Sequence, residues 1–259
     1  MSEYFNFHNS KFFAGSMKQL ILKLTDRITS DETEFTTFIA TPNPEMYVDC
    51  IFDSSFATIL RNTSFNLVDG FGLHALLKLF GFPSSRLTGT DLVSEILKKK
   101  LGSVYILGGI PGNYALLKKK YPNVNFVGYF EGMVGEDNSA ALANEINMLK
   151  PDFLFVALGA PKQERWIVDN LSAIQNVKVA IGIGGALDYM SGNIKRAPSF
   201  VRSMGMEWVF RLVHEPKRYK RILKAVIGFP IMFVLIEGSI IIARNLKRAY
   251  TKCKKTCRF

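Results

Sequence analysis

Four polar residues of this chain stand where buried strands are expected to end. Thr41 closes the apolar segment 35–41, Asn43 follows it, and Asp69 and Gln163 come after two further apolar segments. Parallel strands end at one edge of a sheet, where open α/β sheets bind ligands. A carboxylate there could accept the proton of an attacking hydroxyl, as group transfer to a sugar requires. Asp69 is followed by a glycine, so a simple role as a helix cap stays an alternative.

A glycine-rich turn further along the chain predicts a site for an anionic group. The apolar run 177–183 leads into Gly184 and Gly185, and a helix is expected to open at Ala186. Because glycine has no Cβ atom, backbone amides can come close to a ligand there. This geometry suits a phosphate.

A second turn of this kind begins with Gly108 and Gly109, after the predicted strand 103–107. It resembles half of a dinucleotide fingerprint, and Glu131 follows about 20 residues later, near the position from which an acidic residue binds ribose. The glycine spacing does not complete that fingerprint. A nicotinamide-dependent enzyme therefore remains an alternative.

Positive charge is concentrated in the C-terminal part of the chain. The 33 Lys+Arg and 22 Asp+Glu residues divide into 20 and 20 in residues 1–210, and 13 and 2 in residues 211–259. The whole net charge of +11 therefore belongs to residues 211–259, which favours an appendage that meets an anionic ligand or surface. An anionic group is also expected near the stretch 182–221, whose basic residues are Arg196, Arg202, Arg211, Lys217, Arg218, Lys220 and Arg221.

An apolar run of 19 residues, 225–243, adjoins these cations and is basic on both flanks. Nucleic-acid binding would use the cations but not the apolar run, so we expect no nucleic-acid partner. Glu237 and three Gly or Pro residues interrupt the run, which is barely long enough to span a bilayer. We favour a helix in the plane of an anionic membrane surface, with a spanning helix or one buried in protein as alternatives.

The sequence offers little for a metal ion or for disulfides. Its three cysteines and three histidines are scattered, and an Asp-x-Asp motif is absent. We expect no metal site, no disulfide framework and a reducing, cytoplasmic environment. The N-terminal residues lack the basic and then apolar pattern of a signal peptide.

Strand and helix patterns alternate through the first 210 residues. This order predicts an α/β fold, a doubly wound and mainly parallel Rossmann-like sheet with right-handed crossovers. We expect helices at 45–60, 73–79, 114–120 and 139–149, and strands at 66–69, 125–129 and 152–158. The predicted domains are an α/β body, residues 1–210, and a basic, partly apolar helical appendage, residues 211–259.

Taken together, these motifs resemble glycosyltransferase family 26, the WecG/TagA/CpsF group. The resemblance covers most of the chain and depends on the order and spacing of the motifs. They are Thr41-x-Asn43, Asp69-Gly70-x-Gly72, Thr88-Gly89-x-Asp91, Gly108-Gly109, Gly159-x-Pro161-Lys162-Gln163-Glu164, Gly184-Gly185-x-x-Asp188, Arg196-Ala197-Pro198, Glu207-Trp208-x-x-Arg211 and Glu215-Pro216-x-Arg218.

The resemblance implies a metal-independent, inverting transferase without a cofactor. It would move a sugar, typically of the N-acetylmannosamine type, from UDP to a polyprenyl-diphosphate-linked acceptor at the cytoplasmic face of a bacterial membrane, as a peripheral or monotopic protein. Because no Asp-x-Asp pair holds a metal, arginine side chains would have to stabilise the leaving UDP. A membrane-tethered nucleotide sensor or scaffold without turnover remains the alternative, and the protein could form a homo-oligomer.

The resemblance also assigns roles to individual residues. Asp69 would be the catalytic base, and Thr41 would contact the substrate. Arg211, Arg218 and Arg221 would bind the diphosphate. The residues expected to bind the remainder of the substrate are Asn43, Arg86, Gly108, Gly109, Gln163, Gly184, Gly185 and Asp188.

Overall fold

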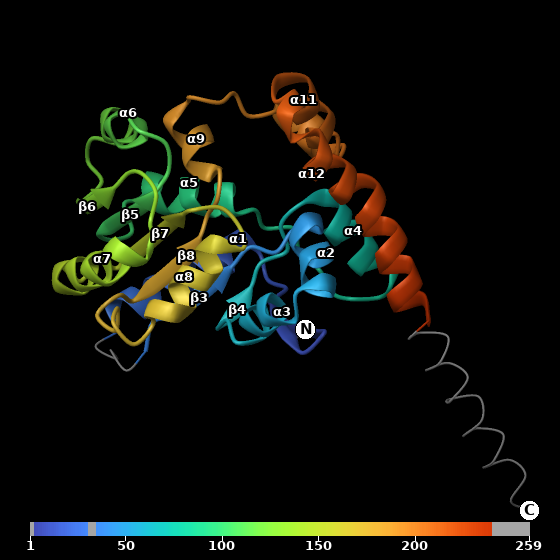
Figure 1. The fold of residues 1–259 in the computed structure, drawn as a ribbon, viewed down its shortest axis with the longest axis horizontal. Coiled ribbons are helices and arrows are strands. Elements are labelled where there is room, and N and C mark those ends of the chain that lie inside the picture. Colours follow the sequence, from blue (N-terminus) through green and yellow to red (C-terminus); the bar gives the residue numbers. More distant parts are fainter. Residues whose placement is uncertain (1–2, 31–34, 240–259) are drawn as a thin grey trace, which may run out of the picture.

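The protein is a single eight-stranded sheet with helices on both faces, seen in a computed structural model that describes residues 3–30 and 35–239 (Figure 1). The strands lie in the order β1-β2-β4-β3-β8-β7-β5-β6. Every neighbouring pair is parallel except β1 with β2. The mainly parallel α/β fold expected from the sequence is confirmed. The strands are β1 (Tyr4–Phe7), β2 (Ser10–Phe13), β3 (Thr37–Ala40), β4 (Phe65–Asn66), β5 (Val104–Gly108), β6 (Phe126–Phe130), β7 (Phe153–Ala157) and β8 (Val179–Gly182).

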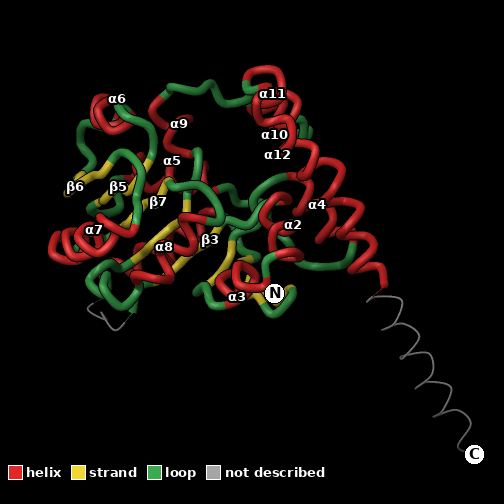
Figure 2. Tube along the Cα trace, viewed as in Figure 1, coloured by secondary structure: helices red, strands yellow, loops and turns green. Residues whose placement is uncertain are grey.

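Two apolar cores lie on the two faces of this sheet. Figure 2 shows the strands of the sheet lying between helices. Successive residues of a strand point to opposite faces, so Ile39 packs in one core and Phe38 in the other. Helices α1 (Met17–Thr29) and α5 (Gly89–Lys99) cover the first face, and α7 (Glu136–Leu149) and α8 (Lys162–Asn170) cover the second. Strands buried on both faces read as continuous apolar runs, which is why the sequence revealed them.

Several elements differ from the sequence-based expectation. The expected helix 45–60 is two helices, α2 (Pro44–Phe52) and α3 (Ser54–Arg61), because Asp53 ends the first and its carboxylate caps the second. The expected strand 66–69 pairs only as β4, followed by an isolated bridge between Val68 and Arg86. The β1–β2 hairpin and α1 were not anticipated.

The remaining helices follow the strands in chain order. They are α4 (Phe71–Leu79), α6 (Asn113–Lys120), α9 (Ala186–Ser191), α10 (Ser199–Ser203), α11 (Glu207–His214) and α12 (Tyr219–Leu223). The predicted domain boundary after residue 210 falls within α11. Helix α12 belongs to a continuous helical segment, Pro216–Ser239, which we call the tail helix. The expected run 225–243 lies in it as far as residue 239, and its last residues lie outside the described part of the chain.

The tail helix packs along the body through a third apolar core. Phe229 and Phe233 are fully buried, and they contact the hairpin residue Phe7 and Tyr47 of α2. Glu237 is also buried, and its carboxylate accepts hydrogen bonds from Tyr47 and pairs with His8. Within residues 3–30 and 35–239, this is the one helix long and apolar enough to cross a membrane by length and composition.

Replacing Phe233 tests whether the tail helix shares its core with the body. Phe233→Ala should lower the free energy of unfolding by about 3 to 5 kcal/mol, since it leaves a cavity between the tail helix and the hairpin. Val234→Ala, on the half-exposed side of the same turn, should stay within about 0.5 kcal/mol. Urea unfolding followed by circular dichroism measures both. Equal values for the two variants would show that the helix does not pack as described.

Candidate active site

A cavity of about 980 Å³ opens at the edge of the sheet where the parallel strands end. The loops after β3, β5, β7 and β8 form one wall, and residues of α11 and the tail helix form another. The cavity is lined by most of the site residues expected from the sequence. These are Thr41, Asn43, Asp69, Gly109, Gln163, Gly184, Gly185, Asp188, Arg211, Arg218 and Arg221.

Asp69 lies in this cavity just beyond β4, and it is not the cap of the helix that follows. The N-cap of α4 is Gly70, whose positive φ of 86° suits glycine, and no side chain caps that helix. The Asp69 carboxylate instead accepts a hydrogen bond from the backbone N–H of Gly89, at 3.2 Å. Burial raises the pKa of Asp69 to about 6, while the Gly89 bond and the nearby Arg211 partly oppose this shift. A carboxylate with this pKa is ionised at neutral pH and can take up a proton.

Thr41 and Asn43 stand beside Asp69 at the end of β3. The Thr41 hydroxyl donates to the carbonyl of Gly182 at 3.2 Å. The Asn43 side-chain oxygen caps α2 by accepting from the Met46 N–H at 3.1 Å. Both side chains therefore have structural partners as well as a place in the cavity wall.

Gln163 is held in one orientation by its neighbours. Its side-chain oxygen accepts from the Gly184 N–H at 2.8 Å, and its amide nitrogen donates to Glu164 at 2.7 Å. Glu164 is fully buried, and burial raises its pKa to about 7. A Cβ atom on Gly182 would lie 2.7 to 2.8 Å from these two side chains, so glycine is required there. Two side chains of α8, Gln163 and Glu164, therefore determine the shape of the glycine turn after β8.

Glu164 ends the motif that begins at Gly159, but no role was predicted for it from the sequence. Its position after Gln163, at the start of an amphipathic helix, was the available signal. Its burial could not be foreseen, because acidic side chains in the first turn of a helix are ordinarily exposed.

Asp188 and Gly109, which belongs to the glycine turn after β5, also line the cavity. Asp188 accepts a hydrogen bond from the Asn113 side chain at 2.9 Å, which ties α9 to α6. Gly109 lines the cavity, whereas Gly108 lies at the end of β5 and is not part of the wall. Glu131 accepts from the N–H groups of Gly112 and Tyr114, at 3.0 and 2.6 Å. Its carboxylate therefore holds the start of α6, which leaves the nicotinamide alternative without its ribose ligand.

Three arginines face the cavity from the C-terminal side, each paired with a glutamate. The pairs are Arg211 with Glu207 at 2.7 Å, Arg218 with Glu215 at 2.6 Å and Arg221 with Glu45 at 2.7 Å. Arg211 also lies over the ring of Tyr189, with 5.3 Å from the guanidinium carbon to the ring centroid. The cations expected to bind a diphosphate are thus brought together at one wall.

Arg86 is not brought into that wall. Its guanidinium donates to the backbone carbonyl of Arg202 at 3.0 Å. Arg196 and Arg202 contact Asp91 at 2.6 and 3.5 Å. These arginines fasten the segment after α9 to α5, and in this structure they do not line the cavity.

The part of the chain that the structure describes lacks a group of side chains that could bind a metal ion. Across residues 3–30 and 35–239, no group of three or more His, Cys, Asp or Glu side chains is placed to hold one. The cationic side chains that the cavity wall offers an anionic ligand are Lys162, Arg165, Arg211, Arg218 and Arg221.

Comparison with known proteins agrees with the resemblance seen in the motifs. Residues 5–240 match the sequence model described as "Glycosyl transferase WecG/TagA/CpsF family". A Bacillus subtilis protein named N-acetylglucosaminyldiphosphoundecaprenol N-acetyl-beta-D-mannosaminyltransferase is 36% identical over 193 residues, 71% of this chain and 74% of the relative. A relative with the same name from Bacillus spizizenii is 34% identical over 78% of this chain and 82% of its own length. Another from Staphylococcus aureus is 30% identical over 80% of this chain and 83% of its own length. This chain belongs to the WecG/TagA/CpsF family of glycosyl transferases.

Proposed function

We propose that this protein moves a sugar of the N-acetylmannosamine type from a UDP-sugar to a polyprenyl-diphosphate-linked acceptor, for a cell-surface polysaccharide or teichoic acid. The names of its relatives support the sugar and the lipid-linked acceptor. The observation that carries the proposal is the cavity itself, which brings a partly buried carboxylate, Asp69, into one site with Arg211, Arg218 and Arg221.

These groups suit a single displacement with inversion. The acceptor hydroxyl oxygen attacks the anomeric carbon of the donor while its proton passes to Asp69. The bond from that carbon to the UDP oxygen breaks, and UDP leaves with the electron pair. Arg211, Arg218 and Arg221 stabilise the charge that develops on the diphosphate, which requires no metal ion. Thr41 and Asn43 lie beside Asp69, in position to contact the reacting sugar.

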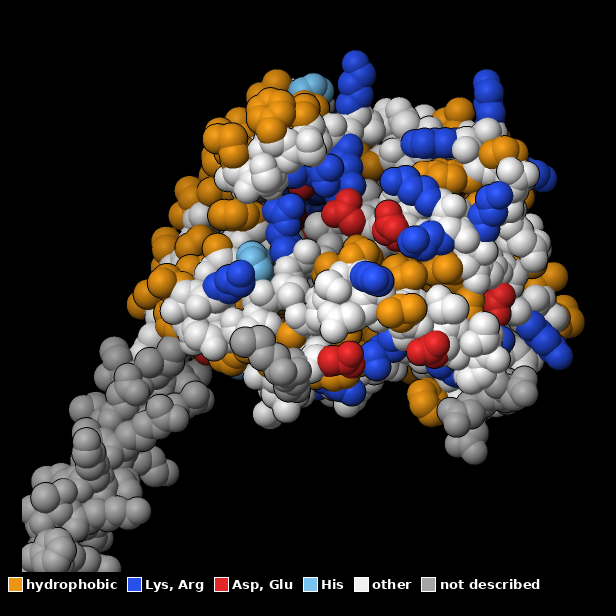
Figure 3. All heavy atoms as spheres, turned by 180° about the vertical axis from the view of Figure 1, so that it is seen from behind, with side chains coloured by type: hydrophobic (Ala, Val, Ile, Leu, Met, Phe, Trp, Pro, Cys, Tyr) orange, Lys and Arg blue, Asp and Glu red, His pale blue; other side chains and the backbone are white. Residues whose placement is uncertain are grey.

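We also propose that the protein works as a peripheral protein at the cytoplasmic face of the membrane. Hydrophobic side chains gather along the edge formed by α11 and the tail helix (Figure 3). On the tail helix the exposed apolar residues are Leu223, Ile227, Ile231, Val234 and Leu235. Exposed cations, Lys217 and Lys220, stand at the beginning of the same helix. Aliphatic side chains beside cations suit an anionic leaflet, with the opposite face of the helix held by the body.

A panel of UDP-sugars with a short-chain prenyl-diphosphate-GlcNAc acceptor tests the proposed activity, and Asp69→Asn tests the base. UDP should be released only when the acceptor is present, and Asp69→Asn should lower this turnover by about 10² to 10⁴. UDP binding, measured by calorimetry, should persist because the substitution keeps the shape of the side chain. Asp137→Asn, on the exposed first turn of α7, is the control. A scaffold or sensor would bind UDP but would not release UDP from any UDP-sugar, with or without the acceptor.

The pH dependence of turnover provides a separate test. Asp69 must be ionised to accept a proton, and its pKa is raised to about 6. The ionised fraction falls as pH drops below that value, so turnover should fall roughly tenfold for each pH unit below about 6. Circular dichroism at each pH separates this loss from unfolding. A flat profile down to pH 5 in a folded protein would remove Asp69 from the role of base.

Arg218→Gln and EDTA together test how the diphosphate is stabilised. Arg218→Gln removes a cation from the cavity wall and should lower turnover by about ten- to a hundredfold. Lys217→Gln removes the same charge one residue earlier, outside the cavity, and should have little effect. EDTA should leave the wild-type rate unchanged. Loss of activity in EDTA that Mg²⁺ or Mn²⁺ restores would contradict the arginine-based account.

A further inference from the structure

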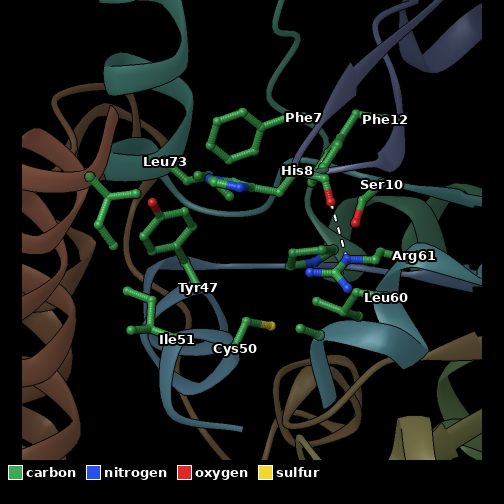
Figure 4. A pocket seen from close by; sticks show the side chains of 13 residues that line it. Phe7, His8, Ser10, Phe12, Tyr47, Cys50, Ile51, Leu60, Arg61 and Leu73 are labelled. Atoms are coloured by element: carbon green, nitrogen blue, oxygen red, sulfur yellow. Dashed lines mark hydrogen bonds between the residues drawn. The ribbon is translucent and has the colours of Figure 1, made fainter. Parts of the chain in front are cut away.

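A second cavity, of about 290 Å³, lies between the β1–β2 hairpin, α2, α3 and the last turns of the tail helix (Figure 4). Its wall shares no residue with the active-site cavity. The two are nevertheless neighbours, because Pro42 lines the second cavity while Thr41 and Asn43, on either side of it in the chain, line the first.

The wall of this cavity is almost entirely apolar. Its principal surfaces come from Phe7, Phe12, Tyr47, Leu60, Leu73 and Ile236. The two ionisable nitrogen-bearing side chains of the wall are already engaged: His8 pairs with Glu237, and the Arg61 Nε donates to the backbone carbonyl of His8. Such a wall has little with which to recognise a sugar or a base, and it suits hydrocarbon. Its volume, at the lower end for small-molecule sites, suits a short length of chain and not a whole lipid.

The tail helix links this cavity to the catalytic one. Arg218 and Arg221, in its first turns, line the active site, and Ile236, near its end, lines the apolar cavity. Arg218 and Ile236 are 18 positions apart, which corresponds to about 27 Å along a helix. A ligand with a charged head at the active site and a long hydrocarbon chain could therefore follow one helix from one cavity to the other.

We propose that the apolar cavity holds a stretch of the prenyl chain of the lipid-linked acceptor. The proposal rests on the function proposed above, which supplies a substrate with such a chain. A protein segment is a poorer occupant, because the space is too small for a helix and exposes few polar groups to pair with a backbone. Interiors are otherwise closely packed, so an apolar void of this size beside a lipid-handling site is best explained by a chain that fills it.

Protection of Cys50 from alkylation tests occupancy without requiring turnover. Cys50 lines the cavity, and Cys253 and Cys257, outside the described residues, are replaced by Ser. Burial raises the pKa of Cys50 to about 12, so the reaction is run at pH 9 with a small uncharged maleimide. Geranylgeranyl diphosphate should slow the alkylation at least fivefold, and UDP should not. Unchanged alkylation would overturn the proposal, as would equal protection by phosphatidylglycerol vesicles, which would indicate a phospholipid site.

A matched pair of substitutions on α3 tests the same cavity by filling it. Ala57 lines the cavity and Thr58, the next residue, is exposed and does not. Ala57→Phe should weaken geranylgeranyl diphosphate binding in equilibrium dialysis at least tenfold, and Thr58→Phe should leave it unchanged. Equal affinity in folded Ala57→Phe protein would contradict the proposal. If Ala57→Phe does not fold, the Cys50 result decides.

The two proposals can fail separately. Sugar transfer by the wild-type protein without protection of Cys50 would overturn the prenyl site and leave the proposed function standing. Protection of Cys50 by the prenyl diphosphate without sugar transfer to any acceptor would overturn the proposed function instead.

Discussion

Burial of two aromatic rings of the tail helix against the body is the contact on which the active-site cavity depends. Phe229 and Phe233 fill a core shared with the hairpin, α2 and α4, and neither ring is exposed. This packing fixes the direction of the tail helix, and with it the placement of Arg218 and Arg221 over the edge of the sheet. Without that contact the sheet edge would keep Asp69 but lose the cations opposite it.

A buried carboxylate adds specificity to the same contact. An unpaired Glu237 in an apolar core would be costly, because burial disfavours the charged form. His8 and Tyr47 satisfy it, and they come from the hairpin and from α2. Such a pair adds little net stability compared with apolar packing, but it strongly disfavours arrangements of the helix in which Glu237 loses its partners. The polar interruption of the apolar run is therefore a feature of its docking onto the body.

The candidate active-site cavity combines a carboxylate, Asp69, with several cationic side chains. Asp69 sits where desolvation raises its pKa, while Arg211, Arg218 and Arg221 each form an ion pair with a glutamate. A diphosphate can share or replace those glutamates, because a planar guanidinium group can donate two parallel hydrogen bonds to the oxygens of either a carboxylate or a phosphate. One wall thus suits proton uptake and the other suits an anionic leaving group.

The sequence by itself determined the parallel sheet and the positions of most site residues. Strands buried on both faces are continuous apolar runs, and the polar residues that follow them must meet at one edge of the sheet. Thr41, Asp69 and Gln163 were found in this way. Arg86 and Gly108 were expected in the site from the resemblance to the family, but the structure does not place them in the cavity wall, since one binds the Arg202 carbonyl and the other ends β5.

Only the tertiary structure decided what the tail helix touches and which spaces it encloses. His8 and Glu237 are 229 positions apart, and no local pattern of charge or hydropathy can reveal such a pair. The apolar face of the tail helix was visible in the sequence, but a membrane and a protein core select the same residue types. The apolar cavity beside Cys50 exists because the hairpin, α2, α3, α4 and the tail helix meet without filling the space between them, and a sequence pattern carries no record of that volume.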